Sequence, residues 1–233
     1  MIPIIITGIG TGIGKTIVSA IIVEALHADY WKPVQAGYDD DTDSVSIKKI
    51  ISNTKSKIYP EIYKLQLAAS PHIAAREEGV RIDLNLIGKE LDEIKDKKLA
   101  IINGKAKDNF YRSVNTDYLI IEGAGGLMVP LNEREFAADL FKKLNAKIIL
   151  VSRNYLGSIN HSLLTAQVCK HYELPVIGWI FNDQYLDYEN EIVQWSGFPR
   201  IASIPYSKNI DKKFIFQEAG NLDQNLRKLF RWL

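Results

Sequence analysis

The chain contains a glycine-rich segment that ends in a lysine and a threonine, Gly8–Thr16 (GIGTGIGKT). Glycines allow consecutive backbone N–H groups to curl around an anion, because a Cβ would obstruct the turn. Lys15 can bring a positive charge to the β- and γ-phosphates of a nucleotide, and the Thr16 hydroxyl can ligate Mg²⁺. The segment therefore predicts a phosphate-binding loop.

The loop departs from the common G-x-x-x-x-G-K-[ST] pattern at one position. That pattern requires glycine where this chain has Ile9, and Gly8 makes the loop one residue longer. A G-x-G-x-x-G dinucleotide site is excluded, because position 13 is Ile13 and no ribose-binding acid ends the next predicted strand. The alternative to a phosphate loop is a glycine-rich turn with an incidental Lys-Thr pair. The strand before it and the helix after it favour the phosphate loop.

Charged residues follow two other predicted strands. Lys32 ends one strand, where it could neutralise a developing anion or be a solvated lysine at the edge of the sheet. The acidic run Asp39–Asp43 is expected to be mostly solvated, with one carboxylate facing a metal ion. Glu122 ends a buried strand and precedes the sequence GAGG. This position predicts that Glu122 coordinates Mg²⁺ or orients its water shell.

Two helix starts could hold an anionic substrate group. Ser70 is predicted to cap one helix, with Pro71 in its first turn, and Leu156–His161 opens another. The free N–H groups of a helix start can bind a carboxylate or a phosphate. For His72 and His161, structural and catalytic roles remain equally open, and no Cys/His spacing indicates zinc.

Short apolar runs and amphipathic stretches alternate along the chain and must position these residues. We expect strands at Ile2–Thr7, Tyr30–Lys32, Tyr118–Glu122, Lys147–Ser152, Val176–Phe181 and Arg200–Ile204, and helices at Lys15–Leu26, Leu84–Ile94, Ser158–Tyr172 and Asn221–Leu233. The pattern predicts an α/β fold: a P-loop NTPase-like, mostly parallel β-sheet with helices on both faces, in one domain over residues 1–233. Ligands gather at the carboxyl ends of strands in such sheets. The segment Leu99–Asn115 receives no assignment.

The composition excludes several classes of protein. The formal net charge of +1 provides no field to recruit nucleic acid or acidic membranes. No stretch approaches the ~20 apolar residues of a membrane span, and the N-terminus lacks the features of a secretory signal. The single cysteine, Cys169, cannot form an internal disulfide, and its apolar helical surroundings indicate an inert buried thiol. A cytoplasmic protein is expected.

Taken in order, these motifs resemble those of dethiobiotin synthetases. The resemblance spans almost the whole chain and rests on TGIGTGIGKT, WKPVQAG, DTD, ASPH, EGAGG with LMVPL, LGSINHSLLTAQ and IFN. It implies carboxylation of 7,8-diaminononanoate with CO₂ (or bicarbonate) and Mg-ATP, through a carbamate and a carbamic–phosphoric anhydride. Ring closure would give dethiobiotin, ADP and phosphate. The resemblance also implies a homodimer with the substrate at the subunit interface, while the net charge and the lack of a long apolar stretch predict no nucleic-acid or membrane partner.

The resemblance further implies a role for each matching residue. The catalytic residues would be Lys32, Lys15 and Thr11, with Lys32 binding the carbamate and the transferred phosphoryl group. ATP would contact Gly12, Ile13, Gly14, Lys15, Thr16 and Ile17, with Asn182 and Pro205 at the adenine. The substrate would lie along Thr11, Lys32, Ser70, Pro71 and Gly125. Its carboxylate would meet the helix start Gly157–Asn160 of the neighbouring subunit, with Gly157 and Asn160 as the contacting residues. The metal ligands would be Thr16, Asp43 and Glu122.

One position departs from the family pattern. Ala36 stands where the family usually has Ser or Thr, so a hydroxyl near the carbamate is missing. A neutral hydrogen bond contributes about 0.5–1.5 kcal/mol, so we expect slower turnover or a substituting water rather than inactivity. The departure also raises the alternative of a non-catalytic paralogue.

Two other ATP-dependent classes remain as alternatives. Partitioning and cell-division ATPases act by nucleotide-dependent dimerisation and carry a lysine at the position of Gly10, and many end in a basic amphipathic helix. The C-terminal stretch 221–233 has such basic residues, although packing on the domain is the favoured interpretation. Amidase-type synthetases of the cobyrinic-acid group carry an added glutaminase domain with a catalytic cysteine, for which this chain has no room.

Overall fold

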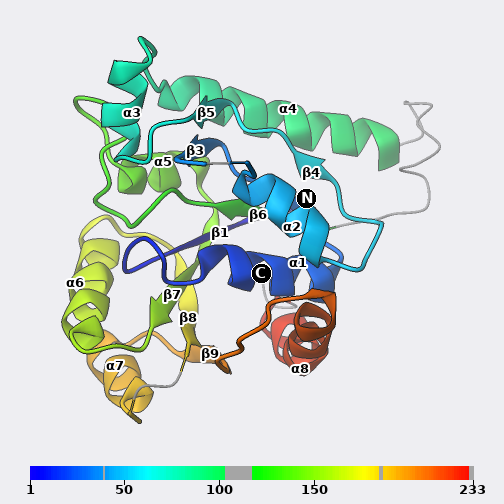
Figure 1. The fold of residues 1–233 in the computed structure, drawn as a ribbon, viewed down its shortest axis with the longest axis vertical. Coiled ribbons are helices and arrows are strands. Elements are labelled where there is room, and N and C mark those ends of the chain that lie inside the picture. The colour runs from blue at the N-terminus through cyan, green and yellow to red at the C-terminus, as the bar shows by residue number, and fades with distance from the viewer. Residues whose placement is uncertain (39, 103–116, 184–185, 231–233) are drawn as a thin grey trace.

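A parallel β-sheet with helices on both faces forms the centre of the computed structural model (Figure 1). The structure describes residues 1–38, 40–102, 117–183 and 186–230. Within them, seven strands pair in parallel in the order β4-β2-β6-β1-β7-β8-β9. Their bounds are Ile58–Tyr59 (β4), Asp29–Trp31 (β2), Tyr118–Glu122 (β6), Ile2–Gly8 (β1), Lys147–Arg153 (β7), Val176–Asn182 (β8) and Arg200–Ile204 (β9). The predicted fold class and all six predicted strands are confirmed, with small differences at the strand ends.

Successive residues of each strand point to opposite faces, and each face packs against its own set of helices. Ile5 belongs to the face covered by α4 (Leu84–Ile102), α5 (Ala137–Leu144), α6 (Ser158–His171) and α7 (Glu189–Ser196). Its neighbours Ile4 and Ile6 belong to the face covered by α1 (Lys15–Leu26), α2 (Asp43–Ile50) and α8 (Lys212–Phe230). Figure 1 shows α1 and α8 together on one side of the sheet and α4 with α5 on the other. Burial on both faces explains why the strand sequences are apolar throughout.

The helix α1 is buried on more of its surface than the predicted one-sided stripe. Its Ser19, Ala20 and Val23, which lie outside the predicted stripe, are inaccessible to solvent. The reason is that α8 begins at Lys212 rather than at the predicted Asn221 and lies against α1. The last predicted residues of that helix, 231–233, lie outside the described residues.

The helix α4 also extends beyond its prediction, from Ile94 to Ile102. The added turns carry Lys98, whose Nζ lies 3.4 Å from Oδ2 of Asp29 in β2, with both side chains buried. This ion pair fixes α4 to the sheet. The extension accounts for Leu99–Ile102 of the unassigned segment, and residues 103–116 lie outside the described part of the chain.

A small second sheet lies beside the strand ends and was not predicted. It pairs β3 (Val34–Ala36) with β5 (Tyr63–Leu65) in parallel, and α3 (Pro71–Glu77) follows it. Ser70 occupies the N-cap position of α3 as expected, but its side chain caps no backbone N–H. Its Oγ instead lies 3.1 Å from Nδ1 of His72, so the predicted side-chain cap is wrong.

In the described part of the chain, no helix is both long enough and apolar enough to cross a membrane.

Candidate functional site

Three neighbouring strands bring the predicted site residues to one edge of the sheet. The strands β2, β6 and β1 are adjacent and parallel, so Lys32, Glu122 and the loop after Gly8 share that edge. Gly8 itself is required by the sheet, because a Cβ there would lie 2.0 Å from the carbonyl oxygen of Val151 in β7. The extra glycine of the loop therefore permits a close approach of two strands.

The phosphate loop contains two glycines in the left-handed conformation. Gly12 has φ 71° and Gly14 has φ 88°, a region that residues with a Cβ rarely adopt. A Cβ on Gly12 would point into open space, whereas one on Gly14 would lie 2.4 Å from Nδ2 of Asn182. The Asn182 amide donates a 2.6 Å hydrogen bond to the carbonyl oxygen of Ile13. The end of β8 thus supports the loop directly, which the sequence did not indicate.

Lys15 is the first residue of α1, and its side chain folds back over the loop. Its Nζ donates a 2.6 Å hydrogen bond to the carbonyl oxygen of Gly10. Burial lowers the pKa of Lys15 to about 8; the Glu122 carboxylate opposes this shift and the Lys32 ammonium adds to it. A nucleotide phosphate near Lys15 would favour the charged ammonium in turn.

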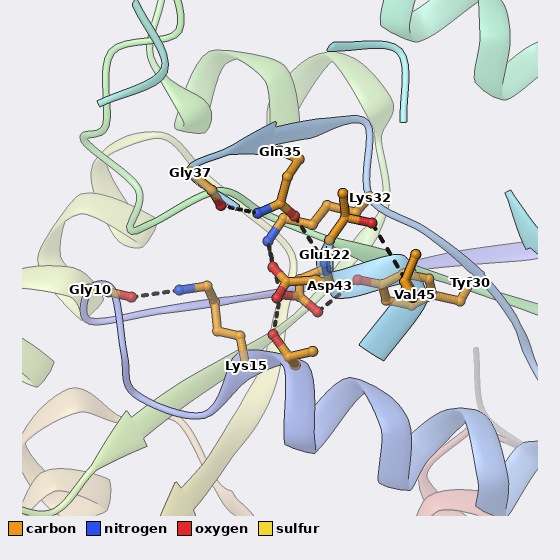
Figure 2. A network of polar contacts seen from close by, with 11 residues as sticks. Gly10, Lys15, Tyr30, Lys32, Gln35, Gly37, Asp43, Val45 and Glu122 are labelled. Atoms are coloured by element: carbon orange, nitrogen blue, oxygen red, sulfur yellow. Dashed lines mark hydrogen bonds and ion pairs between the residues drawn. The ribbon is translucent and has the colours of Figure 1, made fainter. Parts of the chain in front are cut away.

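The buried carboxylate of Glu122 is the centre of a hydrogen-bond network (Figure 2). Its Oε1 accepts from the Thr16 hydroxyl at 2.9 Å and from Nζ of Lys32 at 3.2 Å. Its Oε2 accepts from the Tyr30 hydroxyl at 3.0 Å. Burial, together with Glu122, raises the pKa of Tyr30 well above its usual value, so Tyr30 is protonated and donates.

Lys32 lies between two carboxylates, because its Nζ also contacts Oδ2 of Asp43. Burial alone would lower the pKa of Lys32, but Glu122 and Asp43 outweigh it and raise the pKa. The buried ammonium is therefore held in its charged form beside the phosphate loop. This geometry favours the functional interpretation of Lys32 over that of a solvated edge lysine.

The start of α2 determines which carboxylate of the acidic run faces the site. Thr42 is the N-cap residue and its side chain accepts a hydrogen bond from the N–H of Val45. The next residue, Asp43, faces Lys32, and its N–H donates to Oε1 of Gln35 at 3.2 Å. Asp41 instead forms an exposed ion pair with Lys49. One carboxylate of the run therefore faces the site, as expected, and Asp39 lies outside the described residues.

Sequence reasoning missed two residues that hold this network, Tyr30 and Gln35. Gln35 uses both ends of its amide, because its Nε2 also donates to the carbonyl oxygen of Gly37 at 2.8 Å. It thereby connects β3 to the start of α2. The only sequence signal for either residue was its place within two or three residues of Lys32.

The oxygen atoms of Thr16, Asp43 and Glu122 suit Mg²⁺ in a nucleotide complex. They are hard donors, and Mg²⁺ commonly takes one or two carboxylates and fills its other positions with phosphate and water oxygens. Among the described residues, no group of three or more His, Cys, Asp or Glu side chains is arranged to hold a metal ion. The donor set therefore fits a metal ion that is held together with phosphates, not an all-protein cage.

Two cavities meet at the loop. The larger, of about 870 Å³, is lined by Ala36, Tyr38 and twelve residues of the predicted site: Thr11, Gly12, Gly14, Lys15, Thr16, Ile17, Lys32, Asp43, Ser70, Pro71, Glu122 and Gly125. The smaller, of about 180 Å³, is lined by Ile13, Ile17, Asn182 and Pro205. Gly12, Gly14 and Ile17 line both cavities. The structure does not bring Gly157 and Asn160 to either cavity; both are exposed at the start of α6.

The remaining candidate nucleophile and base lie away from this network. Cys169 is buried in α6, and burial raises the pKa of its thiol to about 12, which agrees with an inert thiol. Nδ1 of His161 lies 2.7 Å from the Tyr155 hydroxyl, and both residues line another cavity together with residues 9–13 of the loop.

Comparison with protein families and curated proteins adds independent information. Residues 3–213 match a family model described as an AAA domain. The chain is 42% identical to ATP-dependent dethiobiotin synthetase BioD of Cytophaga hutchinsonii, over 94% of this chain and 96% of the relative. It is 45% identical to the protein of that name from Christiangramia forsetii, over 76% and 74% of the two chains. The protein of that name from Rhodopseudomonas palustris is 37% identical, over 89% and 88%.

Solved structures with a similar fold are more distant in sequence. The MinC:MinD cell division complex of Aquifex aeolicus matches with a TM-score of 0.59 and 15% identity, over 99% of this chain and 96% of the other. MinD from Pyrococcus horikoshii, complexed with Mg-ADP, matches with a TM-score of 0.58 and 15% identity, over 98% of each chain. At this identity the likeness shows the P-loop NTPase fold alone, and it carries no argument for a cell-division switch.

Proposed function

The chain belongs to the dethiobiotin synthetase family of ATP-dependent ligases, which form a carbon–nitrogen bond in biotin biosynthesis, and we propose the reaction and the roles of the residues. The substrates are 7,8-diaminononanoate, CO₂ and Mg-ATP, and the products are dethiobiotin, ADP and phosphate. The observation that carries the proposal is the 870 Å³ cavity, which is lined by the phosphate loop together with Ser70, Pro71 and Gly125. A nucleotide phosphate and a small diamine can meet there.

ATP binds with its phosphates on the loop and its base in the smaller cavity. The backbone N–H groups of the loop and the start of α1 face the phosphates, and Lys15 moves from the Gly10 carbonyl to the β- and γ-phosphates. The Nδ2 of Asn182 is committed to Ile13, so its Oδ1 is the atom available to accept from the exocyclic amino group of adenine. Pro205 packs at the base from the end of β9.

Thr16, Asp43 and Glu122 hold Mg²⁺ together with the phosphates in this proposal. When bound, the ion neutralises charge that develops on the β- and γ-phosphate oxygens. Thr16 already points its hydroxyl at Glu122, and Asp43 is placed across the site by the N-terminus of α2. The two carboxylates also keep Lys32 charged.

The reaction follows three steps that the lysines assist. One amine of the diamine attacks CO₂ and loses a proton, which gives a carbamate. A carbamate oxygen then attacks the γ-phosphorus and ADP leaves. The second amine attacks the carbonyl carbon of the resulting anhydride, loses a proton and expels phosphate, and the ureido ring closes. Lys32 and Lys15 face the anionic transferred group, and Thr11 contacts the diamine from the loop.

The carboxylate end of the substrate is proposed to reach a second copy of the chain. Gly157 and Asn160 are exposed at the start of α6 and line neither cavity of their own chain. In a homodimer, the N–H groups at this helix start would bind the carboxylate of the neighbour's substrate. The use of ATP agrees with a cytoplasmic enzyme, and the expectation of one domain over residues 1–233 stays a prediction.

A coupled assay tests the proposal. The purified chain is incubated with 7,8-diaminononanoate, bicarbonate, Mg²⁺ and ATP, and ADP and dethiobiotin are quantified in parallel by chromatography and mass spectrometry. We expect equal amounts of both products, and neither product when the diamine is left out. ADP without dethiobiotin, or no diamine-dependent ADP, would sink the proposal.

A further inference from the structure

The buried tyrosine Tyr30 contacts the carboxylate of Glu122 on the side away from the cavity. We propose that Tyr30 is a positioning residue, which orients the Glu122 carboxylate so that one of its oxygens faces the phosphate loop and Mg²⁺. This inference rests on the metal site of the proposed function. It assigns a role to a residue that does not itself touch nucleotide, metal or substrate.

The two oxygens of Glu122 have different kinds of partner. Oε1 accepts from Thr16 and Lys32, which both line the large cavity. Oε2 accepts from Tyr30, which is fully buried and does not line the cavity. Figure 2 shows Tyr30 and Lys15 on opposite sides of Glu122. The Tyr30 bond therefore anchors the inner oxygen and leaves the outer oxygen to the loop.

The strand register explains why a tyrosine reaches this carboxylate. In the pairing of β2 with β6, Tyr30 stands opposite Ile120. Ile120 and Glu122 are two residues apart in β6, so their side chains point to the same face of the sheet, roughly 7 Å apart along the strand. Tyr30 packs on that face with Ile120 and Val18 of α1. A ring with a hydroxyl at its far end spans the distance to Glu122, whereas the ring of a phenylalanine would fill the same space without a donor.

Loss of the hydroxyl would leave Oε2 without its donor inside the protein. A buried carboxylate oxygen without a partner is costly, so the carboxylate would turn to satisfy both oxygens from Thr16 and Lys32. That turn would compete for the Thr16 hydroxyl and draw Lys32 away from the cavity. Residues that orient metal ligands typically change metal affinity by 10- to 100-fold when they are replaced.

The test measures ADP binding by isothermal titration calorimetry with Mg²⁺ and with EDTA, for the wild-type chain and for Tyr30→Phe. We expect the two proteins to bind ADP equally in EDTA. Addition of Mg²⁺ should strengthen ADP binding less in Tyr30→Phe, and its half-saturating Mg²⁺ concentration should be roughly 10-fold higher or more. Tyr63→Phe is the matched control, because the hydroxyl that it removes accepts from the N–H of Asp83 at the start of α4. It should behave as wild type.

A double-mutant comparison shows whether the Tyr30 hydroxyl acts through Glu122. Tyr30→Phe is placed in a Glu122→Gln background, where it should change the Mg²⁺ dependence no further. The same loss in both backgrounds would show that the hydroxyl acts by a route other than the Glu122 carboxylate and would overturn the inference. Unchanged Mg²⁺ dependence in Tyr30→Phe would overturn it while leaving the metal site intact. A wild-type chain without any Mg²⁺ dependence would overturn the metal site and the inference together.

Discussion

The side-chain amide of Asn182 donates a 2.6 Å hydrogen bond to the carbonyl oxygen of Ile13, and this bond connects the end of β8 to the phosphate loop. A residue that we propose to contact adenine therefore also supports the phosphate loop. The amide lies so close to the loop that a Cβ on Gly14 would meet its Nδ2 at 2.4 Å.

Asn182→Asp should weaken binding of both the base and the phosphates. The substitution places a carboxylate against the Ile13 carbonyl, which removes a buried hydrogen bond and adds repulsion, so we expect a cost of about 1–3 kcal/mol. The measurement compares ADP with pyrophosphate, which has no base. Both ligands should bind more weakly. Weaker binding of ADP alone would show that Asn182 acts only on adenine.

Lys32→Ala should lower turnover far more than it weakens nucleotide binding. Lys32 is held charged between Glu122 and Asp43, where it faces the transferred phosphoryl group in the proposed reaction. Loss of one such stabilising group typically lowers kcat by roughly 10²- to 10³-fold. The measurements are kcat and the Kd for ADP. Lys49→Ala is the control, because the ion pair that Lys49 of α2 forms with Asp41 is exposed. Equal losses in kcat and affinity would show that Lys32 merely binds nucleotide.

Ala36→Ser should raise turnover. The Ala36 methyl group lines the large cavity, at the position where the family pattern has a hydroxyl. One added neutral hydrogen bond, at about 0.5–1.5 kcal/mol, corresponds to roughly a 2- to 10-fold gain in kcat/KM for the diamine. Steady-state kinetics at saturating ATP provide the measurement. An unchanged or lower rate would show that a water or another side chain already supplies this contact.

Cys169 should resist thiol reagents until the protein unfolds. Burial raises the pKa of its thiol to about 12, so the native thiol is protonated at pH 8, whereas an unfolded cysteine has a pKa near ~8.5. Native stability should accordingly fall as the pH rises above ~8.5, because the unfolded chain then loses a proton that the native chain keeps. The measurement is the rate of reaction with Ellman's reagent at pH 8, with and without denaturant. Rapid labelling of the native chain would contradict the assigned burial.

The sheet was predictable from sequence because its strands are buried on both faces and are therefore apolar throughout. The start of α8 was missed although Asp211, a residue type typical of helix N-caps, directly precedes it. In the structure the Asp211 carboxylate accepts a hydrogen bond from the N–H of Phe214, as a helix N-cap does. The strands β3 and β5 are three residues each and carry no periodicity that could indicate them.

The candidate site was predictable where it depends on strand ends and motifs. Lys15 and Thr16 begin a helix, Lys32 follows a strand and Glu122 ends one, and the parallel sheet brings them together. The role of Tyr30 depends on the register between β2 and β6, which the sequence does not reveal. Gly157 and Asn160 line neither cavity, so their proposed role depends on a second chain.

Transfer of oxygen from CO₂ to phosphate is the most direct test that ATP and the carboxylated diamine react in one site. Freshly prepared ¹⁸O-labelled bicarbonate is mixed with enzyme, Mg-ATP and 7,8-diaminononanoate, and the reaction is quenched before the label exchanges with water. Mass spectrometry of the released phosphate should show one ¹⁸O atom per phosphate, in amounts equal to the dethiobiotin formed. Unlabelled phosphate accompanied by labelled dethiobiotin would contradict phosphoryl transfer to a carbamate.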